Sequence, residues 1–290
     1  MNPLGAASAF LAAAIWGGMY VASKYVLGFV TPLVLVELRF AIGLAKLGAM
    51  LLLTRGRFVS RHDLPQMALL GLVGFTVSIG AQFAGTKLST AANAALITSA
   101  TPALVVLIAW WLLGEPLRQR QLLGLALATA GVIVVSDPSA ASLAPDLALG
   151  NGFLFLAALT WALYSVLAKR ASRGYPVLTV TTYATLFGLI FSAPLAAGEL
   201  AISGPPPELP TLAIFGVFYL GVISTAGAFY LWNVGMALLD SAVAAVFFFA
   251  QPLVGAFFGW LLLGERLGPA FFVGGALIFC GVVVVSFVRK

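Results

Sequence analysis

The stretch TPALVVLIAWWLLGE at residues 101–115 returns 150 positions later as QPLVGAFFGWLLLGE at residues 251–265. The correspondence runs without a gap over residues 91–136 and 241–286, and 19 of these 46 positions are identical. Chance similarity between apolar helices is the alternative. Matched tryptophan, proline and Gly-Glu residues over such a length argue against it, so we interpret the chain as two copies of one unit.

The two copies extend to the beginning of the chain with an offset of 145. Leu4-Gly5 corresponds to Leu149-Gly150, Trp16 to Trp161, and Lys24 to Lys169. We therefore assign residues 1–140 to the first repeat and residues 145–290 to the second, and expect them to form one structural unit.

Composition indicates that the solvent of this chain is lipid. Hydrophobic residues make up 62% of the sequence and charged residues 8%, whereas soluble proteins carry about 25% charged residues. A spanning helix needs about 20 apolar residues. Ten such runs predict an all-α integral membrane protein with ten transmembrane helices, at roughly 4–23, 32–53, 65–86, 91–113, 119–136, 149–168, 177–198, 211–234, 241–263 and 268–288.

The helix count and the basic residues predict the topology. Five helices per copy is an odd number, so the second copy starts on the opposite side of the membrane, which is the inverted repeat typical of many secondary transporters. With the N-terminus in the cytoplasm, ten of the lysines and arginines outside the helices lie on the inner side and three on the outer side. The positive-inside rule thus predicts that both termini are cytoplasmic.

Several other functions are disfavoured. The single cysteine, Cys280, lies in an apolar run and the single histidine, His62, in a polar gap, so we expect no disulfide framework, no metal site and no cofactor. A membrane-embedded enzyme would need clustered acids, histidines or cysteines, or an activated serine. Residues 1–20 lack the basic start of a signal peptide and recur in the second repeat, which favours a mature first helix.

The sequence resembles a known transporter family. Trp16-Gly17 with Lys24, Leu38-Arg39-Phe40, and the repeated stretches from Ala91 and from Ala242 through a proline to Leu-Gly-Glu are similar to the EamA-like family of the drug/metabolite transporter superfamily. The resemblance covers essentially the whole chain, although Trp161-Ala162 departs from the first copy. It implies a ten-helix alternating-access carrier, usually an exporter of amino acids or related metabolites. It also implies a central cavity lined by helices one to four and six to nine.

The second predicted helix carries three charged residues within its apolar run. Arg39 and Lys46 are seven positions apart and share a helix face. Our hypothesis is that Arg39, with Lys46 as a second candidate, attracts a substrate carboxylate in the cavity. The alternatives are that Arg39 anchors a helix end and that Lys46 snorkels to the cytoplasm. Glu37 lies nearly opposite Arg39 and could carry a coupling proton, or it could pair with a neighbouring helix.

Aromatic and amide side chains complete the set of candidate residues. Those that we expect to line the cavity, rather than to pack or to form an interfacial belt, are Trp16, Tyr20, Trp161, Tyr164 and Ser165. Gln82, Asn93, Asn233 and Gln251 could bind substrate or join helices to one another. Pro102 and Pro252 could be gating bends or passive kinks. We interpret Glu115 and Glu265 as structural residues at helix starts.

Together these features predict a secondary transporter that exports amino acids or related carboxylate-bearing solutes across a bacterial inner membrane. Its partners would be a small-molecule substrate, membrane lipid and, as a coupling ion, the proton, and it would act as a monomer or homodimer without nucleic acid. The alternative functions are an efflux carrier for lipophilic cations or for nucleobase- or sugar-like solutes and, least favoured, an enzyme.

Overall fold

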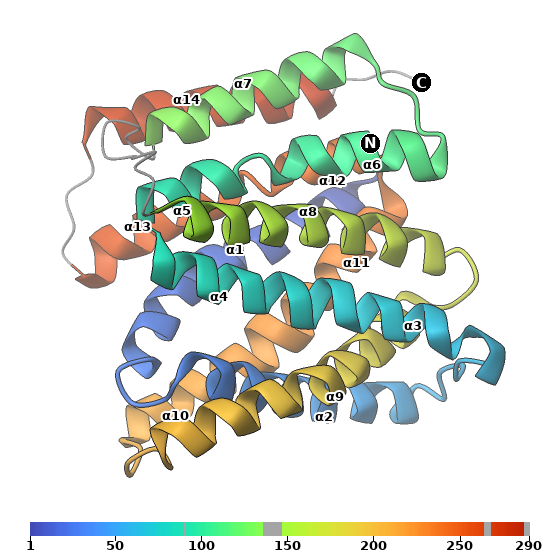
Figure 1. Cartoon of the computed structure of the whole chain (residues 1–290). Helices are drawn as coiled ribbons and strands as arrows, with labels where there is room; N and C mark the ends of the chain where they lie inside the picture. The colour runs from blue at the N-terminus through green and yellow to red at the C-terminus, as the bar shows by residue number, and fades with distance from the viewer. Residues whose placement is uncertain (90, 136–146, 264–267, 287–290) are drawn as a thin grey trace.

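A computed structural model describes residues 1–89, 91–135, 147–263 and 268–286 (Figure 1). All regular secondary structure in these ranges is helical, and it forms ten helical passages, as the apolar runs predict. Five stretches are each long and apolar enough to cross a bilayer unaided: Arg61–Thr86, Ala148–Ala171, Val177–Ser203, Thr211–Leu238 and Ser241–Phe258. The chain is a multi-pass membrane protein.

In the first repeat the third passage contains a π-helical segment, and the fourth passage is interrupted at residues 99–100. The first two passages are α1 (Pro3–Val26) and α2 (Pro32–Leu53). The third consists of η1 (Arg61–Asp63), α3 (Leu64–Leu70), η2 (Gly71–Val77) and α4 (Ser78–Leu88), the fourth of α5 (Ala91–Thr98) and α6 (Thr101–Leu113), and the fifth is α7 (Gln119–Val135). The passages of the second repeat are formed by α8 (Ala148–Ala171), α9 (Val177–Ser203), α10 (Thr211–Phe218) with η5 (Tyr219–Gly227) and α11 (Ala228–Leu238), α12 (Ser241–Phe247) with α13 (Ala250–Leu263), and α14 (Pro269–Ser286).

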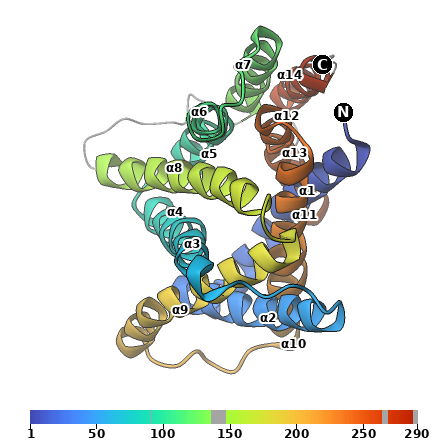
Figure 2. The same ribbon diagram turned by 90° about the vertical axis from the view of Figure 1, so that its right-hand side faces the viewer.

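Helix packing reproduces the sequence repeat. The first helix of one copy packs against the third and fourth passages of the other: α1 against α11 and α13, and α8 against α4 and α6. The second helix of each copy likewise packs against the π-helical segment of the other, α2 against η5 and α9 against η2. The two last helices, α7 and α14, lie side by side at one edge of the bundle (Figures 1 and 2).

The two π-helical segments lie at equivalent positions, and glycines bring each one close to its neighbour. A Cβ on Gly221 of η5 would lie 2.6 Å from Ile42 of α2, and a Cβ on Gly71 of η2 would lie 2.5 Å from Phe187 of α9. A Cβ atom does not fit at either distance, so both close crossings require glycine at these positions. π-Helical turns within α-helices often occur at functional sites.

The fourth and ninth passages are both broken in the middle, at residues 99–100 and 248–249. Pro102 and Pro252 lie in the first turn of the half-helix that follows each break. Proline has no N–H to donate, so the first turn of a new helix is where it costs least. A helix break therefore precedes each of the two matched prolines, and the role of these prolines in gating stays a prediction.

Candidate substrate site

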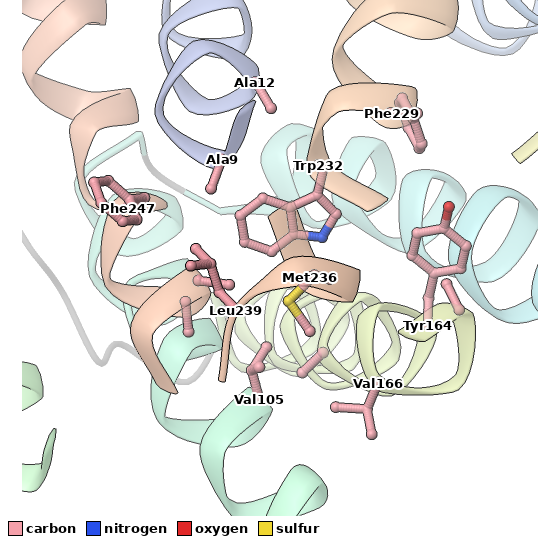
Figure 3. Packing of buried hydrophobic residues seen from close by; sticks show 14 of the residues in the cluster. Ala9, Ala12, Val105, Tyr164, Val166, Phe229, Trp232, Met236, Leu239 and Phe247 are labelled. Atoms are coloured by element: carbon pink, nitrogen blue, oxygen red, sulfur yellow. The ribbon is translucent and has the colours of Figure 1, made fainter. Parts of the chain in front are cut away.

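Aromatic side chains from both repeats meet at the centre of the bundle. The ring centroids of Trp16 on α1 and Trp161 on α8 are 5.3 Å apart, with an edge-to-face angle of 85°. The ring centroids of Phe229 and Trp232 on α11 lie 5.4 and 5.8 Å from that of Trp16. Tyr164 lies 5.2 Å from Trp161 and 6.5 Å from Phe229, and Figure 3 shows Tyr164, Phe229 and Trp232 in the same buried region. We call Trp16, Trp161, Tyr164, Phe229 and Trp232 the aromatic cluster. Mid-bundle burial excludes an interfacial belt for Trp16, of which 4% is exposed.

Two polar atoms in and next to the aromatic cluster are buried without a hydrogen-bond partner in the described part of the chain. They are Nε1 of Trp161, a donor, and Oδ1 of Asn233, an acceptor. Unpaired buried polar atoms are costly and therefore uncommon in folded proteins. A bound solute with an acceptor and a donor group could satisfy both atoms.

The orientation of the Asn233 amide follows from its neighbours. Its Nδ2 donates to the Tyr164 hydroxyl at 2.8 Å and to the Thr181 hydroxyl at 3.0 Å. The Thr181 hydroxyl already donates to the Val177 carbonyl at 2.8 Å, so it must accept from Asn233. Flipping the amide would lose this bond, which leaves Oδ1 as the atom without a donor.

Arg39 lies next to the aromatic cluster and is almost completely buried, with 4% of it exposed. Its Nε donates to the Thr225 hydroxyl at 2.8 Å and its Nη2 to the Ser224 hydroxyl at 3.3 Å, both on η5. Trp16 Nε1 donates to the Ser224 carbonyl at 3.1 Å, which connects Arg39 to the cluster. Among the described residues Arg39 forms no ion pair. A buried cation with neutral partners is costly and attracts an anion.

The other charged side chains of α2 contact two different helices. Lys46 Nζ donates to the Val222 carbonyl of η5 at 3.1 Å, so the shared face of Arg39 and Lys46 points toward η5. Glu37 accepts a 2.6 Å hydrogen bond from Ser192 of α9. Glu37 thus has the partner on a neighbouring helix that the sequence left open, and a proton-carrying role stays a prediction.

Ser165 contacts two members of the cluster, and the backbone of Gln251 contacts the residue that follows Trp16. The Ser165 hydroxyl accepts from Trp232 Nε1 at 3.0 Å and donates to the Trp161 carbonyl at 2.9 Å. The Gln251 carbonyl lies directly against Gly17, the residue after Trp16, where a Cβ would come within 2.6 Å of it. The side chain of Tyr20 lies outside the described part of the structure.

Asn93 connects the starts of two helices. Asn93 Nδ2 donates to Asn151 of α8 at 2.9 Å and to Ser89 at 3.2 Å, which fastens the start of α5 to the start of α8. Gln82 is half-buried on α4. The geometry of Asn93 is that of a side chain joining two helices, the second of the roles considered for it.

Sequence reasoning missed a polar network at one end of the bundle. Lys169 and Glu115 form an ion pair of 2.7 Å there, and both contact Ser241. Glu115 is thus more than a helix-start residue. A signal was present, because Lys24 and Lys169 correspond in the repeat and so do Glu115 and Glu265. The Lys24 side chain and Glu265 lie outside the described residues.

The family can now be established by comparison. A sequence model of the EamA-like transporter family matches residues 3–137 and again residues 148–287. The chain belongs to this family. This is a family of transporters, not of enzymes.

Similar proteins cover almost the full chain. An uncharacterized transporter of Archaeoglobus fulgidus is 27% identical over 280 residues, or 97% of each chain. A protein of Escherichia coli named as a probable amino-acid metabolite efflux pump is 28% identical over 292 residues, which cover 95% of this chain and 92% of the pump. A solved crystal structure with 28% sequence identity superimposes with a TM-score of 0.85 over 97% of this chain and 96% of its own.

Proposed function

We propose that this protein is a secondary transporter that exports amino acids or related carboxylate-bearing solutes by alternating access across a bacterial inner membrane. The observation that carries the proposal is Arg39, a buried cation without a carboxylate partner among the described residues, next to the aromatic cluster. The name of the Escherichia coli relative, a probable amino-acid metabolite efflux pump, supports the same class of substrate.

Each group at the site would have a separate task. Arg39 would supply positive charge for the carboxylate, and its effect would be strong because surrounding lipid and protein screen charge weakly. Trp161 Nε1 would donate to the solute, and Asn233 Oδ1 would accept from its ammonium or amide group. The faces and edges of the cluster rings would contact its apolar part.

A binding measurement on purified protein tests the proposal. We would record thermal unfolding with amino acids and with the corresponding amines that lack the carboxylate. A ligand at 100 times its Kd stabilises a protein by about 2.7 kcal/mol, so a bound acid should raise the Tm clearly. Arg39→Gln should abolish the shift with acids, whereas Arg170→Gln, a change of an exposed arginine at the end of α8, should retain it.

The result that would contradict the proposal is an equal Tm shift with acids in Arg39→Gln and in the unchanged protein. A second function, efflux of lipophilic cations, is favoured by one observation, the aromatic cluster, because ring faces attract cations. Under that alternative only cations would raise the Tm, and Glu37→Gln rather than Arg39→Gln would remove the effect.

A further inference from the structure

The polar network at one end of the bundle joins three chain segments. Glu115 directly follows Gly114, which ends α6 in the left-handed conformation with φ of 67°. Lys169 lies in the last turn of α8, and Ser241 is the first residue of α12. Lys169 Nζ and Glu115 Oε1 are 2.7 Å apart, and the two side chains are 10% and 21% exposed. We call Glu115, Lys169 and Ser241 the latch.

The polar groups of the latch are satisfied by one another and by the Leu239 carbonyl. Besides Glu115, Lys169 Nζ donates to the Leu239 carbonyl at 2.6 Å and to the Ser241 hydroxyl at 3.1 Å, so its three hydrogens each have an acceptor. Glu115 in turn accepts from the Ser241 backbone N–H at 2.8 Å and from the Ser241 hydroxyl at 3.1 Å. A buried ion pair is stable only when its remaining polar groups are satisfied in this way.

The latch connects the two repeats across one end of the aromatic cluster. Glu115 belongs to the first repeat, whereas Lys169, Leu239 and Ser241 belong to the second. Trp161 and Lys169 are eight residues apart on α8, or about 12 Å along the helix axis. The adjoining cavity, lined by Glu115, Arg118, Gln121 and Asp240 among others, has a volume of about 30 Å³, room for a few water molecules.

We propose that the latch is the gate that closes this end of the transporter, and that it must open for solute to pass there. The inference rests on the proposed alternating access. It has a physical reason in the choice of charged groups. Separating two apolar surfaces exposes them to water at a cost in free energy, whereas separated Lys169 and Glu115 regain their hydration. An ion pair can therefore stabilise the closed state without making the open state much higher in free energy.

A thiol-labelling experiment tests the gate without knowledge of the substrate. Ala12 is fully buried on α1, about one helical turn before Trp16. The start of α1 lies at the end of the bundle that carries the latch, because Gly5 packs against Leu239 there. Ala12 is therefore on the latch side of Trp16. Figure 3 shows Ala12 with Trp232 and Leu239 among the buried residues. We would introduce Ala12→Cys together with Cys280→Ser and measure its rate of reaction with a small water-soluble methanethiosulfonate in detergent.

Loss of one charge should open the gate. Lys169→Met and Glu115→Gln should each raise the labelling rate by about tenfold or more, because each leaves a largely or partly buried charge unpaired. The exchange of both residues, Lys169→Glu with Glu115→Lys, should return the rate toward that of the parent. Arg170→Met, a change of the exposed neighbour, is the matched control and should label at the parental rate.

Equal labelling rates in the parent and all latch variants would overturn the gate, as would a parent that reacts as fast as unfolded protein. Size-exclusion profiles show which variants fold. Glu115→Gln keeps the shape of the side chain and one of its two acceptor oxygens, so it decides the question if Lys169→Met does not fold. Labelling requires no solute. The labelling result can therefore be interpreted even if the carboxylate proposal is wrong. The Arg39 binding result can likewise be interpreted even if the latch is not a gate.

Discussion

Two tryptophans at equivalent positions of the two repeats differ in what their indole N–H groups bind. Trp16 donates to the Ser224 carbonyl at 3.1 Å, whereas Trp161 Nε1 is buried with no partner among the described residues. The rings themselves pack together with a centroid distance of 5.3 Å. The difference suggests that the Trp16 N–H serves the fold and the Trp161 N–H is available to a solute.

Replacing each tryptophan by phenylalanine separates the two roles. Trp16→Phe should lower the free energy of unfolding by about 1–3 kcal/mol, because it leaves the buried Ser224 carbonyl without this donor. Trp161→Phe should change the stability much less, since no hydrogen bond is lost, but it should weaken solute binding. Tm values in detergent and ligand-induced Tm shifts measure the two effects. A larger loss of stability in Trp161→Phe would contradict this assignment.

Helix periodicity explains which residue-scale features the sequence could predict. Arg39 and Lys46 share a face because they are seven residues apart, and the structure turns this face toward η5. Their partners could not be predicted, because Ser224, Thr225 and Val222 lie more than 170 residues away along the chain. The same limit hid the contact of Asn93 with Asn151, which only the packing of α5 against α8 brings about.

At the scale of elements, the close crossings of α2 with η5 and of α9 with η2 organise the centre of the bundle. Gly43 on α2 faces Thr225 on η5, where a Cβ would lie 2.8 Å from the threonine methyl group. Gly48, on the same helix, has nothing within 4 Å of a Cβ. The repeat pairs Gly71 of η2 with Gly221 of η5 in the sequence, but it carries no sign of the π-helical turns around them.

A matched pair of substitutions on α2 tests the crossing. Gly43→Ala should destabilise the protein by about 1–3 kcal/mol, because the added methyl group must displace Thr225 or part the helices. Gly48→Ala should be neutral or slightly stabilising, since alanine favours a helix over glycine. Thermal unfolding in detergent measures both. Equal Tm values for the two variants would show that the crossing is looser than the structure indicates.

At the scale of the whole molecule, the helix packing follows the two-copy repeat. The ten passages and their order were predictable from apolar runs and from the constant offset, because lipid requires both long helices and internally satisfied backbone. Equivalent helices of the two copies make equivalent contacts with the other copy: α1 packs against α11, and α8 packs against α4. The second helix of each copy differs in charge, since Arg39 and Lys46 correspond in the repeat to the uncharged Ala184 and Phe191. This asymmetry is the reason for expecting an anionic group on the substrate.

Counterflow in proteoliposomes is the most direct measurement of the central claim, the transport of carboxylate-bearing solutes through a site that depends on Arg39. Vesicles loaded with an unlabelled amino acid that raises the Tm should accumulate the labelled acid but not the labelled amine without its carboxylate. Arg39→Gln should reduce this uptake at least about tenfold, as expected for a lost charge-assisted contact, and Arg170→Gln should retain it. Equal uptake of acid and amine, or full uptake by Arg39→Gln, would contradict the account.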